Sequence, residues 1–285
     1  MESNSAPKTG KPKISAVLLA RNEEANIRYC LETVRWCSEI IVVDMESSDR
    51  TREIAKEYTD RVYSHPRLEV FDVAKKFAVE KADGDWILLV DADEMVPHSL
   101  SLALTGLALK NEADIVEVPF NNYIMGDRVG HSGWGATAPP RFFRKGKIIF
   151  TETIHDYMQR APGARVVRLE PAEANCISHF NYSDSAQFVE KLNRYTDVEA
   201  QHLFDKGVIF SYLGLFRAAL SEFYWRFIRH SGYKNGVRGF SLCLMMAFYR
   251  ALAYIKLWEK YEFRELLVSE RYKKLRESIL AGWGK

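Results

Sequence analysis

The residues best suited to chemistry are two aspartates, Asp91 and Asp93, which follow the apolar run Trp86–Val90. Such a run is typical of a buried strand, so both carboxylates are expected at the carboxyl edge of a sheet. Hard divalent cations prefer oxygen ligands and usually share them with substrate phosphates. Solvated loop acids are the alternative interpretation. The strand before the pair favours a site that holds a divalent ion against a diphosphate.

Two other apolar runs end in polar residues that are expected at the same edge. Ile14–Ala20 is followed by Arg21-Asn22-Glu23-Glu24, and Glu39–Asp44 ends in a carboxylate. Ligands of parallel sheets bind beyond the carboxyl ends of the strands. Asp44 there can accept hydrogen bonds from a base N–H or from ribose hydroxyls, with a helix or loop cap as the alternative. For Glu46 and Asp49, a capping role is the favoured interpretation.

The elements that must position these side chains alternate between strands and helices. Strands are expected at 14–20, 39–44, 62–64 and 86–91, and helices at 26–36, about 49–58, 71–81 and 99–109. This alternation predicts βαβ units, and hence a parallel sheet with helices on both faces.

The pattern changes after about residue 112. Short strands are expected at 115–118, 141–143, 148–150, 165–169 and 177–179, followed by a helix at 183–206. The sequence therefore predicts a polar, disordered tail at 1–12 and a nucleotide-binding βαβ half at 13–112. A mixed-sheet half of the same domain follows at 113–205, and a helical region at 206–285.

The helical region is basic and aromatic. Residues 206–285 carry 15 Lys and Arg against 6 Asp and Glu, and residues 206–258 hold 13 aromatic residues. The longest uncharged stretch, Gly239–Tyr249, has 11 residues, whereas a membrane-spanning helix needs about 20 apolar residues. Helices lying on an anionic membrane surface fit better. Packing on the rest of the chain is the alternative, and with no recognisable nucleic-acid module, nucleic acid is not an expected partner.

Composition and cysteine content limit the class of protein. The 285 residues are 47% hydrophobic and 27% charged, which excludes a disordered or collagen-like chain. Four scattered cysteines exclude a disulfide framework or a zinc finger and make the cytoplasm the simplest expectation. Residues 1–13 lack the apolar segment of a signal peptide.

Several runs together resemble the family-2 glycosyltransferases of the GT-A fold. They are "ISAVLLARNEEANIRYCLETVRWCSEIIVVDMESSDRTREIAKEY" and "EKADGDWILLVDADE". The later runs "RFFRKGKIIFTETIHDYM", "ISHFNYSD", "EKLNRYT" and "YIKLWEKYEF" are similar to the bacterial branch related to lipopolysaccharide-core β-glucosyltransferases. The resemblance covers about residues 13–263. It implies an α/β fold of the GT-A type, Rossmann-like, with a mostly parallel central sheet, helices on both faces and a C-terminal helical extension.

The resemblance also implies a nucleotide-sugar donor, most often UDP-linked. The end of the first strand and Asp44 would hold the nucleoside. Lys75 and Lys76 stand where relatives carry a basic residue near the diphosphate, and an exposed helix face is the alternative for both. The donor-binding residues so predicted are Ala20, Arg21, Asn22, Glu23, Asp44, Lys75, Lys76, Asp91 and Ala92.

The implied cofactor is Mg²⁺ or Mn²⁺, with Asp93, Asp91 and His179 as metal ligands. A hydrogen-bonded structural histidine is the alternative for His179. Inverting transfer needs a general base on the acceptor side. Asp156 matches the family's acidic position and is the predicted base, with a surface ion pair as the alternative. His155 is predicted to orient the site, to serve as the base or to pack.

Some positions stay open within the resemblance. Glu46-Ser47-Ser48 stands where relatives often have Gly-Ser in "DSGSTDRT", and Lys76 stands where Asn is common. These departures leave the phosphate contacts and the donor identity open, but not the fold. In the glycine-rich loop 126–135, His131 and Trp134 are predicted to stack on a sugar ring, to gate the site or to pack in the core.

The sequence thus predicts a metal-dependent inverting glycosyltransferase that is cytoplasmic and peripheral on the inner face of the cell membrane. It would move glucose or a related hexose from a UDP-linked donor to a cell-envelope glycolipid such as lipopolysaccharide core. A protein or peptide acceptor stays open, because the fold does not dictate the acceptor. A catalytically silent sugar-nucleotide or glycan-binding scaffold stays open too. A nucleotidyltransferase is disfavoured by the lack of glycine in 21–24.

Overall fold

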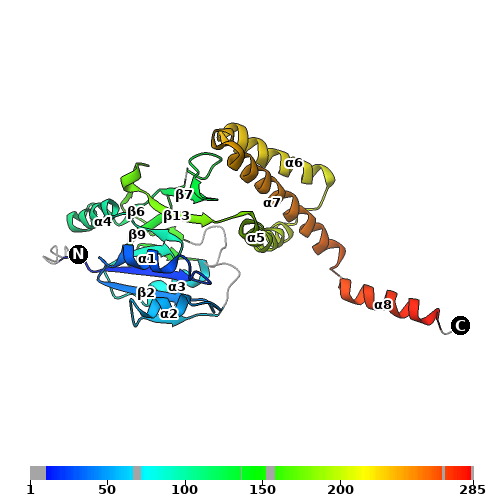
Figure 1. Ribbon diagram of the computed structural model, residues 1–285, viewed down its shortest axis with the longest axis horizontal. Helices are drawn as coiled ribbons and strands as arrows, with labels where there is room; N and C mark the ends of the chain where they lie inside the picture. The colour runs from blue at the N-terminus through cyan, green and yellow to red at the C-terminus, as the bar shows by residue number, and fades with distance from the viewer. Residues whose placement is uncertain (1–10, 67–71, 136, 152–157, 265–266, 284–285) are drawn as a thin grey trace. The chain divides into compact units, whose positions relative to one another are not determined.

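The computed structural model describes residues 11–66, 72–135, 137–151, 158–264 and 267–283 (Figure 1). The chain divides into two compact units. Unit 1 comprises Met1–Gly130 and Trp134–Asn181, and unit 2 comprises His131–Gly133 and Tyr182–Lys285. Unit 2 therefore begins before the helical region expected at 206. Residues 1–10 of the predicted tail lie outside the described residues.

Unit 1 is built on a seven-stranded sheet with the order β12-β6-β9-β4-β1-β2-β3. Its first four strands have the predicted bounds and run parallel: β1 (Ile14–Ala20), β2 (Glu39–Asp44), β3 (Val62–Ser64) and β4 (Trp86–Asp91). The other three are β6 (Ile115–Glu117), β9 (Pro140–Arg144) and β12 (Val166–Arg168). Only β9 runs antiparallel to its neighbours, which are β4 and β6.

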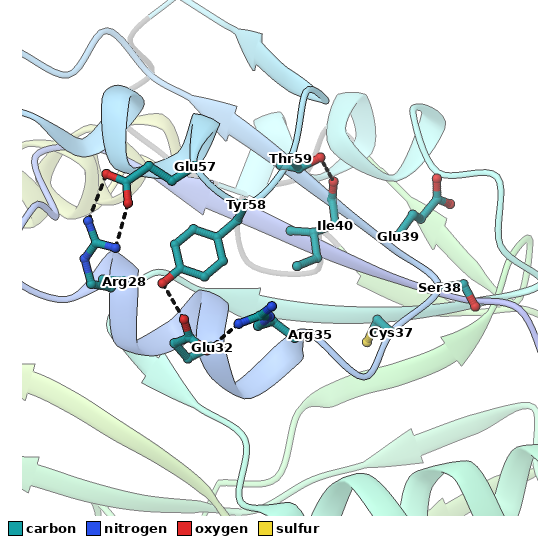
Figure 2. Close-up of a pocket in the computed structure, with 10 residues that line it drawn as sticks. All are labelled: Arg28, Glu32, Arg35, Cys37, Ser38, Glu39, Ile40, Glu57, Tyr58 and Thr59. Atoms are coloured by element: carbon teal, nitrogen blue, oxygen red, sulfur yellow. Dashed lines mark hydrogen bonds and ion pairs between the residues drawn. The ribbon is translucent and has the colours of Figure 1, made fainter.

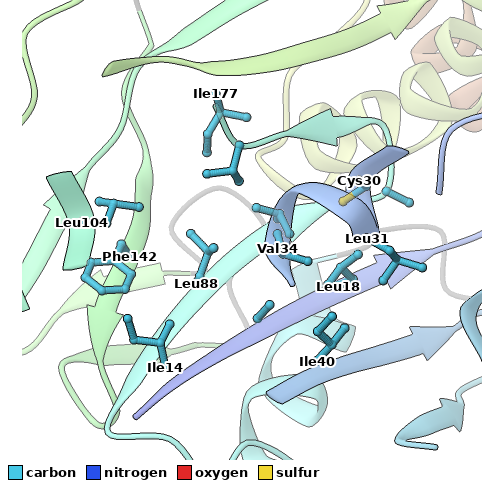
Figure 3. Close-up of a cluster of buried hydrophobic side chains, with 14 of the residues drawn as sticks. Ile14, Leu18, Cys30, Leu31, Val34, Ile40, Leu88, Leu104, Phe142 and Ile177 are labelled. Carbon is cyan, nitrogen blue, oxygen red and sulfur yellow. The ribbon is translucent and has the colours of Figure 1, made fainter. Parts of the chain in front are cut away.

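Helices cover both faces of this sheet, as predicted. They are α1 (Ile27–Val34), α2 (Thr51–Lys56), α3 (Asp72–Glu80) and α4 (His98–Lys110). Successive residues of a strand point to opposite faces, so Leu18 of β1 joins one buried cluster and Leu19 the other. Helices α1 and α4 pack on the first cluster (Figure 3). Helix α2 packs on the same cluster, and α3 packs on the second.

Smaller sheets complete unit 1. Strands β5 (Glu94–Met95), β13 (Ile177–Tyr182), β7 (Phe120–Ile124) and β8 (Asp127–Arg128) form a four-stranded sheet in that order. Strands β10 (Ile148–Phe150) and β11 (Met158–Arg160) form a hairpin-like pair, and a 3₁₀ turn spans Glu173–Asn175. Because β5 follows β4 almost directly, the four-stranded sheet begins at the edge where Asp91 lies.

Unit 2 is helical in its described part. It contains α5 (Ser185–Asp205), α6 (Tyr212–Tyr224), a π-helical turn at Trp225–Arg229, a 3₁₀ turn at Gly232–Asn235, α7 (Gly236–Glu262) and α8 (Val268–Ala281). Helix α7 packs against α5 and α6. Arg250 on α7 contacts Glu222 of α6 at 3.1 Å and Glu199 of α5 at 3.0 Å. Among the described residues, one helical stretch, Gly232–Glu262, has the length and apolar composition of a membrane-crossing helix, with 28% of its most apolar window buried.

Candidate active site

Three strand ends meet at one edge of the large sheet. Ala20, the last residue of β1, pairs with Asp44, the last residue of β2. On the other side of β1, Leu19 pairs with Asp91, the last residue of β4. The parallel register therefore brings Ala20, Asp44 and Asp91 side by side. The loops after these strands all begin at the same edge of the sheet.

The loops after β1 and β2 are joined by side chains of the predicted donor site. Asn22 adopts a left-handed backbone conformation with φ at 52°. Its Oδ1 accepts from the Ser48 backbone N–H at 2.8 Å, and its own N–H donates to Ser47 Oγ at 3.0 Å. Glu23 Oε2 accepts from Asn26 Nδ2 at 2.8 Å. Asn22 and Glu23 thus shape the loops, and a direct contact of either with the donor stays a prediction.

Asp49 accepts a hydrogen bond from a free N–H at the start of α2, although the N-cap position is Arg50. Asp49 Oδ1 accepts from the Thr51 N–H at 3.0 Å, and Asp49 Oδ2 accepts from the Glu24 N–H at 3.1 Å. Burial would raise the pKa of Asp49, but its hydrogen bonds, led by that from the Thr51 hydroxyl, outweigh burial and lower it. As an ionised carboxylate, Asp49 therefore links the loop after β1 to the start of α2 through hydrogen bonds.

Asp44 differs from these loop residues because part of its carboxylate lacks a partner. The residue is 3% exposed. Its Oδ2 faces the Ser47 N–H at 3.4 Å, whereas its Oδ1 is buried with no hydrogen-bond partner among the described residues. A buried polar atom without a partner is costly. The geometry therefore leaves Oδ1 available to a hydrogen-bond donor of a ligand, such as a base N–H or a ribose hydroxyl.

Asp91 lies in a buried ion-pair cluster. Arg141 Nη2 contacts Asp91 Oδ2 at 2.8 Å and Glu94 Oε1 at 2.6 Å, and Glu94 Oε2 accepts from the Asp91 N–H at 2.9 Å. Burial would raise the pKa of Asp91, but the charge of Arg141, followed by that of Lys75, holds it well below its usual range. Burial, with the charge of Asp91, raises the pKa of the fully buried Glu94. Arg141 therefore keeps Asp91 ionised.

The two lysines predicted near the diphosphate differ. Lys75 is half-buried on α3, and its charge lowers the pKa of Asp91. Lys76, the next residue, is exposed. Lys75 is thus the lysine whose charge reaches the sheet edge. The position of Lys76 agrees with the alternative of an exposed helix face.

Asp93 and His179 face each other across the edge of the small sheet. His179 Nε2 lies 3.5 Å from Asp93 Oδ2, and the strand pairing of β5 with β13 sets His179 opposite Glu94. On its other side, His179 Nδ1 lies 3.0 Å from Asn122 Oδ1 of β7. Burial would lower the pKa of His179, but the nearby Asp93 carboxylate outweighs burial and raises that pKa.

These residues fit a site in which a divalent ion is held partly by the protein and partly by substrate phosphates. Among the described residues, no group of three His, Cys, Asp or Glu side chains is placed to hold a metal by itself. Mg²⁺ is usually held by one or two carboxylates together with substrate phosphates. The Asp93 carboxylate and the Nε2 of His179 supply such a partial set, and the contact from Asn122 to the other ring nitrogen is typical of metal-ligating histidines. Asp91, by contrast, is already engaged by Arg141.

The remaining predicted site residues fall in different places. Asp156 and His155 lie outside the described residues. Ala92 is buried in the first cluster. His131 is exposed and belongs to unit 2, whereas the Trp134 carbonyl accepts a hydrogen bond from Asn122 Nδ2 within unit 1.

Two hollows of unit 1 differ in their relation to this site. One of about 270 Å³ borders Asp93 and is also lined by Tyr29, Met95 and Phe180. The other, about 510 Å³, lies at the beginning of β2, away from Asp44 (Figure 2). Its charged side chains pair with one another, for example Arg28 with Glu57 at 2.7 Å. The second hollow is therefore not part of the candidate site.

The sequence analysis missed three residues of the site: Glu94, Asn122 and Arg141. Glu94 directly follows the aspartate pair, so its position was a usable signal. Asn122 and Arg141 lie on short strands that are distant in sequence. Each lies beside an aromatic residue in a short strand. Nothing in the neighbouring sequence indicates which other strand the side chain contacts.

A comparison with known protein families identifies the family of this chain. The family model described as "Glycosyl transferase family 2" matches residues 15–170, which include the three strand ends and Arg141. The chain belongs to glycosyl transferase family 2. The predicted family and the GT-A fold, with its C-terminal helical region, are thereby confirmed, and the protein is a family-2 glycosyltransferase.

Two relatives that align with about nine-tenths of the chain are also named glycosyltransferases. An uncharacterized glycosyltransferase of Rickettsia typhi is 28% identical, and the alignment covers 91% of this chain and 92% of the relative. The lipopolysaccharide core biosynthesis glycosyltransferase LpsC of Rhizobium meliloti is 23% identical, with coverage of 89% and 95%.

Two solved structures are among the matches. One is glucosyl-3-phosphoglycerate synthase from Mycobacterium tuberculosis in complex with Mn²⁺, UDP-glucose and phosphoglyceric acid. It is 28% identical over 40% of this chain and 45% of its own, with a TM-score of 0.33. The other is S. aureus TarS in complex with UDP-GlcNAc, 13% identical over 88% and 91%, with a TM-score of 0.47.

Proposed function

We propose that this family-2 glycosyltransferase transfers a hexose, with inversion, from a UDP-linked donor to a cell-envelope glycolipid such as lipopolysaccharide core, in a metal-dependent reaction. The single observation that carries the donor side is the convergence of Asp44, Asp91 and Asp93 at one sheet edge. Asp44 Oδ1 has no hydrogen-bond partner among the described residues, which supports a contact with a donor group of the nucleoside. The name of LpsC supports the acceptor class.

The chain's own residues have separate roles in the proposed reaction. Asp44 binds the nucleoside, and Lys75 offsets negative charge on the diphosphate as the sugar leaves. Arg141 keeps Asp91 ionised and in place at the donor. Asp156 accepts the proton of the acceptor hydroxyl on the face opposite the leaving group, and His155 orients this base.

Asp93 and His179 would hold Mg²⁺ or Mn²⁺, with Asp91 close by. When bound, the ion supplies positive charge that stabilises the leaving diphosphate. The 3.5 Å between the Asp93 carboxylate and His179 Nε2 supports this assignment. Asp91 contributes chiefly through its charge, since Arg141 already binds it.

Replacing Asp44 by Ala tests the nucleoside contact. Loss of a hydrogen bond to a buried carboxylate costs about 1.5–3 kcal/mol, so we expect UDP to bind roughly 10–150-fold more weakly by calorimetry. Asp60→Ala is the control, because Asp60 is an exposed acid in the turn before β3. Equal UDP affinity in Asp44→Ala and wild type would remove Asp44 from the donor site.

We further propose that unit 2 holds the enzyme on the inner face of the membrane. An apolar stripe on α7, consisting of Val237, Phe240, Leu244 and Phe248, is exposed and repeats at helical spacing. Helix α6 exposes a second one, Leu213, Phe216, Leu220 and Tyr224. Large exposed apolar patches mark interaction sites, and the basic composition of the region favours an anionic lipid surface.

The packing of α7 supports a surface position rather than a spanning one. Lys256 on α7 contacts Asp197 of α5 at 2.8 Å, and Arg250 contacts both α5 and α6. Charged side chains are costly in the hydrocarbon core. If α7 crossed the membrane, Arg250 and Lys256 would lie in the hydrocarbon core, either with their acidic partners or without them.

Sedimentation with vesicles of phosphatidylcholine and phosphatidylglycerol tests the membrane proposal. The double variant Phe240→Ser, Leu244→Ser removes the middle of the α7 stripe and should reduce the bound fraction, because less apolar surface leaves water. Leu102→Ser, Leu109→Ser is the matched control, since both leucines are exposed on α4 of unit 1. A wild-type protein that stays in the supernatant, or equal loss in the control, would contradict the proposal.

A further inference from the structure

Asn122 links the candidate metal ligand to the rest of unit 1. The residue lies on β7, which neighbours β13 in the four-stranded sheet, and it is 4% exposed. Both ends of its side-chain amide have partners. Nδ2 donates to the Trp134 carbonyl, and Oδ1 lies 3.0 Å from His179 Nδ1.

These two contacts fix which way the amide points. A backbone carbonyl only accepts hydrogen bonds, so the Asn122 atom that faces Trp134 must be the NH₂ group. The atom that faces His179 is therefore the carbonyl oxygen, which also only accepts. His179 must then carry a hydrogen on Nδ1 and donate it to Asn122.

The tautomer of His179 follows from this contact. A neutral imidazole carries one hydrogen, and if it lies on Nδ1, the lone pair lies on Nε2. Nε2 is the atom that faces Asp93, at 3.5 Å, which is longer than a normal N–H···O hydrogen bond, whereas the 3.0 Å contact between Nδ1 and Asn122 has normal length. Of the two contacts, the one with Asn122 therefore decides the tautomer. The opposite tautomer would set the Nδ1 lone pair against the Asn122 oxygen and would direct an N–H at the place where a cation is needed.

We propose that Asn122 is a positioning residue, which holds His179 in the Nδ1-protonated tautomer and so presents Nε2, beside Asp93, to the divalent ion. This inference rests on the proposed function in taking His179 as a metal ligand. Asn122 does not touch the donor or the ion. The contact to the Trp134 carbonyl keeps the Asn122 oxygen aimed at the imidazole and prevents the amide from turning.

The first test measures Mn²⁺ binding directly, from the electron paramagnetic resonance signal of free Mn²⁺ with UDP present. Asn122→Leu has a similar size and no acceptor, and we expect it to weaken Mn²⁺ binding by about 10–100-fold, as is typical for loss of such a contact. Its affinity for UDP in EDTA should not change. Asn121→Leu is the matched control, because Asn121 is on the same strand and equally buried, and successive strand residues face opposite ways.

Asn122→Asp is the conservative variant. Its carboxylate keeps an acceptor for Nδ1–H but loses the donor to the Trp134 carbonyl, so Mn²⁺ affinity should fall less than in Asn122→Leu. Carboxylate–histidine contacts serve the same purpose in other metal sites. If Asn122→Leu does not fold, a tenfold or greater loss of Mn²⁺ affinity in Asn122→Asp overturns the proposal. Unchanged Mn²⁺ affinity in a folded Asn122→Leu overturns it as well.

A second test needs no metal. Histidine labelled with ¹⁵N, observed by NMR in the metal-free wild type at a pH where the imidazole is neutral, reports which nitrogen of His179 carries the hydrogen. The His179→Gln variant assigns the signal. Protonation on Nδ1 is expected, and protonation on Nε2 overturns the proposal. A wild type that shows the Nδ1 tautomer but binds no Mn²⁺ with UDP contradicts the proposed metal site and leaves the tautomer assignment standing.

Discussion

Replacing Asp93 by Asn should lower turnover of the UDP-sugar by about 10²–10³-fold, because the side chain keeps its shape but loses the charge that would hold the divalent ion. Asp93 has two features that lead to this expectation. It follows the strand end at Asp91, and it lies 3.5 Å from His179 Nε2. The measurement is release of UDP from UDP-glucose with a glycolipid acceptor and saturating Mn²⁺.

Asp60→Asn provides the control for this experiment, since it removes an exposed negative charge outside the site. Its turnover should match that of the wild type. The Asp93→Asn protein should also remain folded, with a cooperative thermal unfolding transition in EDTA. A folded Asp93→Asn enzyme that retains full, Mn²⁺-stimulated turnover would show that Asp93 does not bind the metal.

Replacing Arg141 by Met should lower the free energy of unfolding by about 3–5 kcal/mol, the usual cost of leaving a buried charge without its partner. Arg141 contacts both Asp91 and Glu94, and the Glu94 side chain is fully buried. Without the guanidinium, the fully buried Glu94 and the partly exposed Asp91 lose the cation that both contact. Urea unfolding followed by circular dichroism measures the effect.

A second substitution separates charge from packing in this cluster. Glu94→Gln removes one of the two carboxylate charges, so Arg141→Met, Glu94→Gln should recover part of the lost stability. Arg28→Met is the comparison, because its ion pair with Glu57 is about half exposed on both sides. Surface pairs of this kind contribute little. Equal loss of stability in Arg28→Met and Arg141→Met would contradict the account of the cluster.

The sequence was sufficient to predict the parallel half of the sheet and its polar edge. Long apolar runs such as Ile14–Ala20 and Trp86–Val90 are buried on both faces, so their ends are marked by a change from apolar to polar residues. The run Glu39–Asp44 ends in Asp44, and Asp91 and Asp93 follow Trp86–Val90. Their convergence needs only the rule that parallel strands end at one edge.

The rest of the site depends on contacts between segments far apart in the chain. Strand β9 runs antiparallel to β4 with Leu88 opposite Phe142, so its first residues lie at the edge where β4 ends. This register brings Arg141 to Asp91 across 50 positions of sequence. The local run around Arg141 predicts a strand, but it carries no information about the direction or the neighbour of that strand.

The two-residue strand β5 and the five-residue strand β7 illustrate the same limit. Neither is long enough to show a period of two residues convincingly. Both form because β13 lies between them. The contact of Asn122 with His179 is a product of that tertiary pairing, and so it could be found only in the structure.

We propose that the sheet edge formed by Asp44, Asp91 and Asp93 binds a nucleotide sugar together with a divalent ion. Calorimetric titration of UDP-glucose into the wild-type protein, once in EDTA and once in Mn²⁺, tests this proposal most directly. We expect at least tenfold tighter binding in Mn²⁺, and loss of that gain in Asp93→Asn. Equal affinity in EDTA and Mn²⁺, or a Mn²⁺ gain that persists in Asp93→Asn, would contradict it.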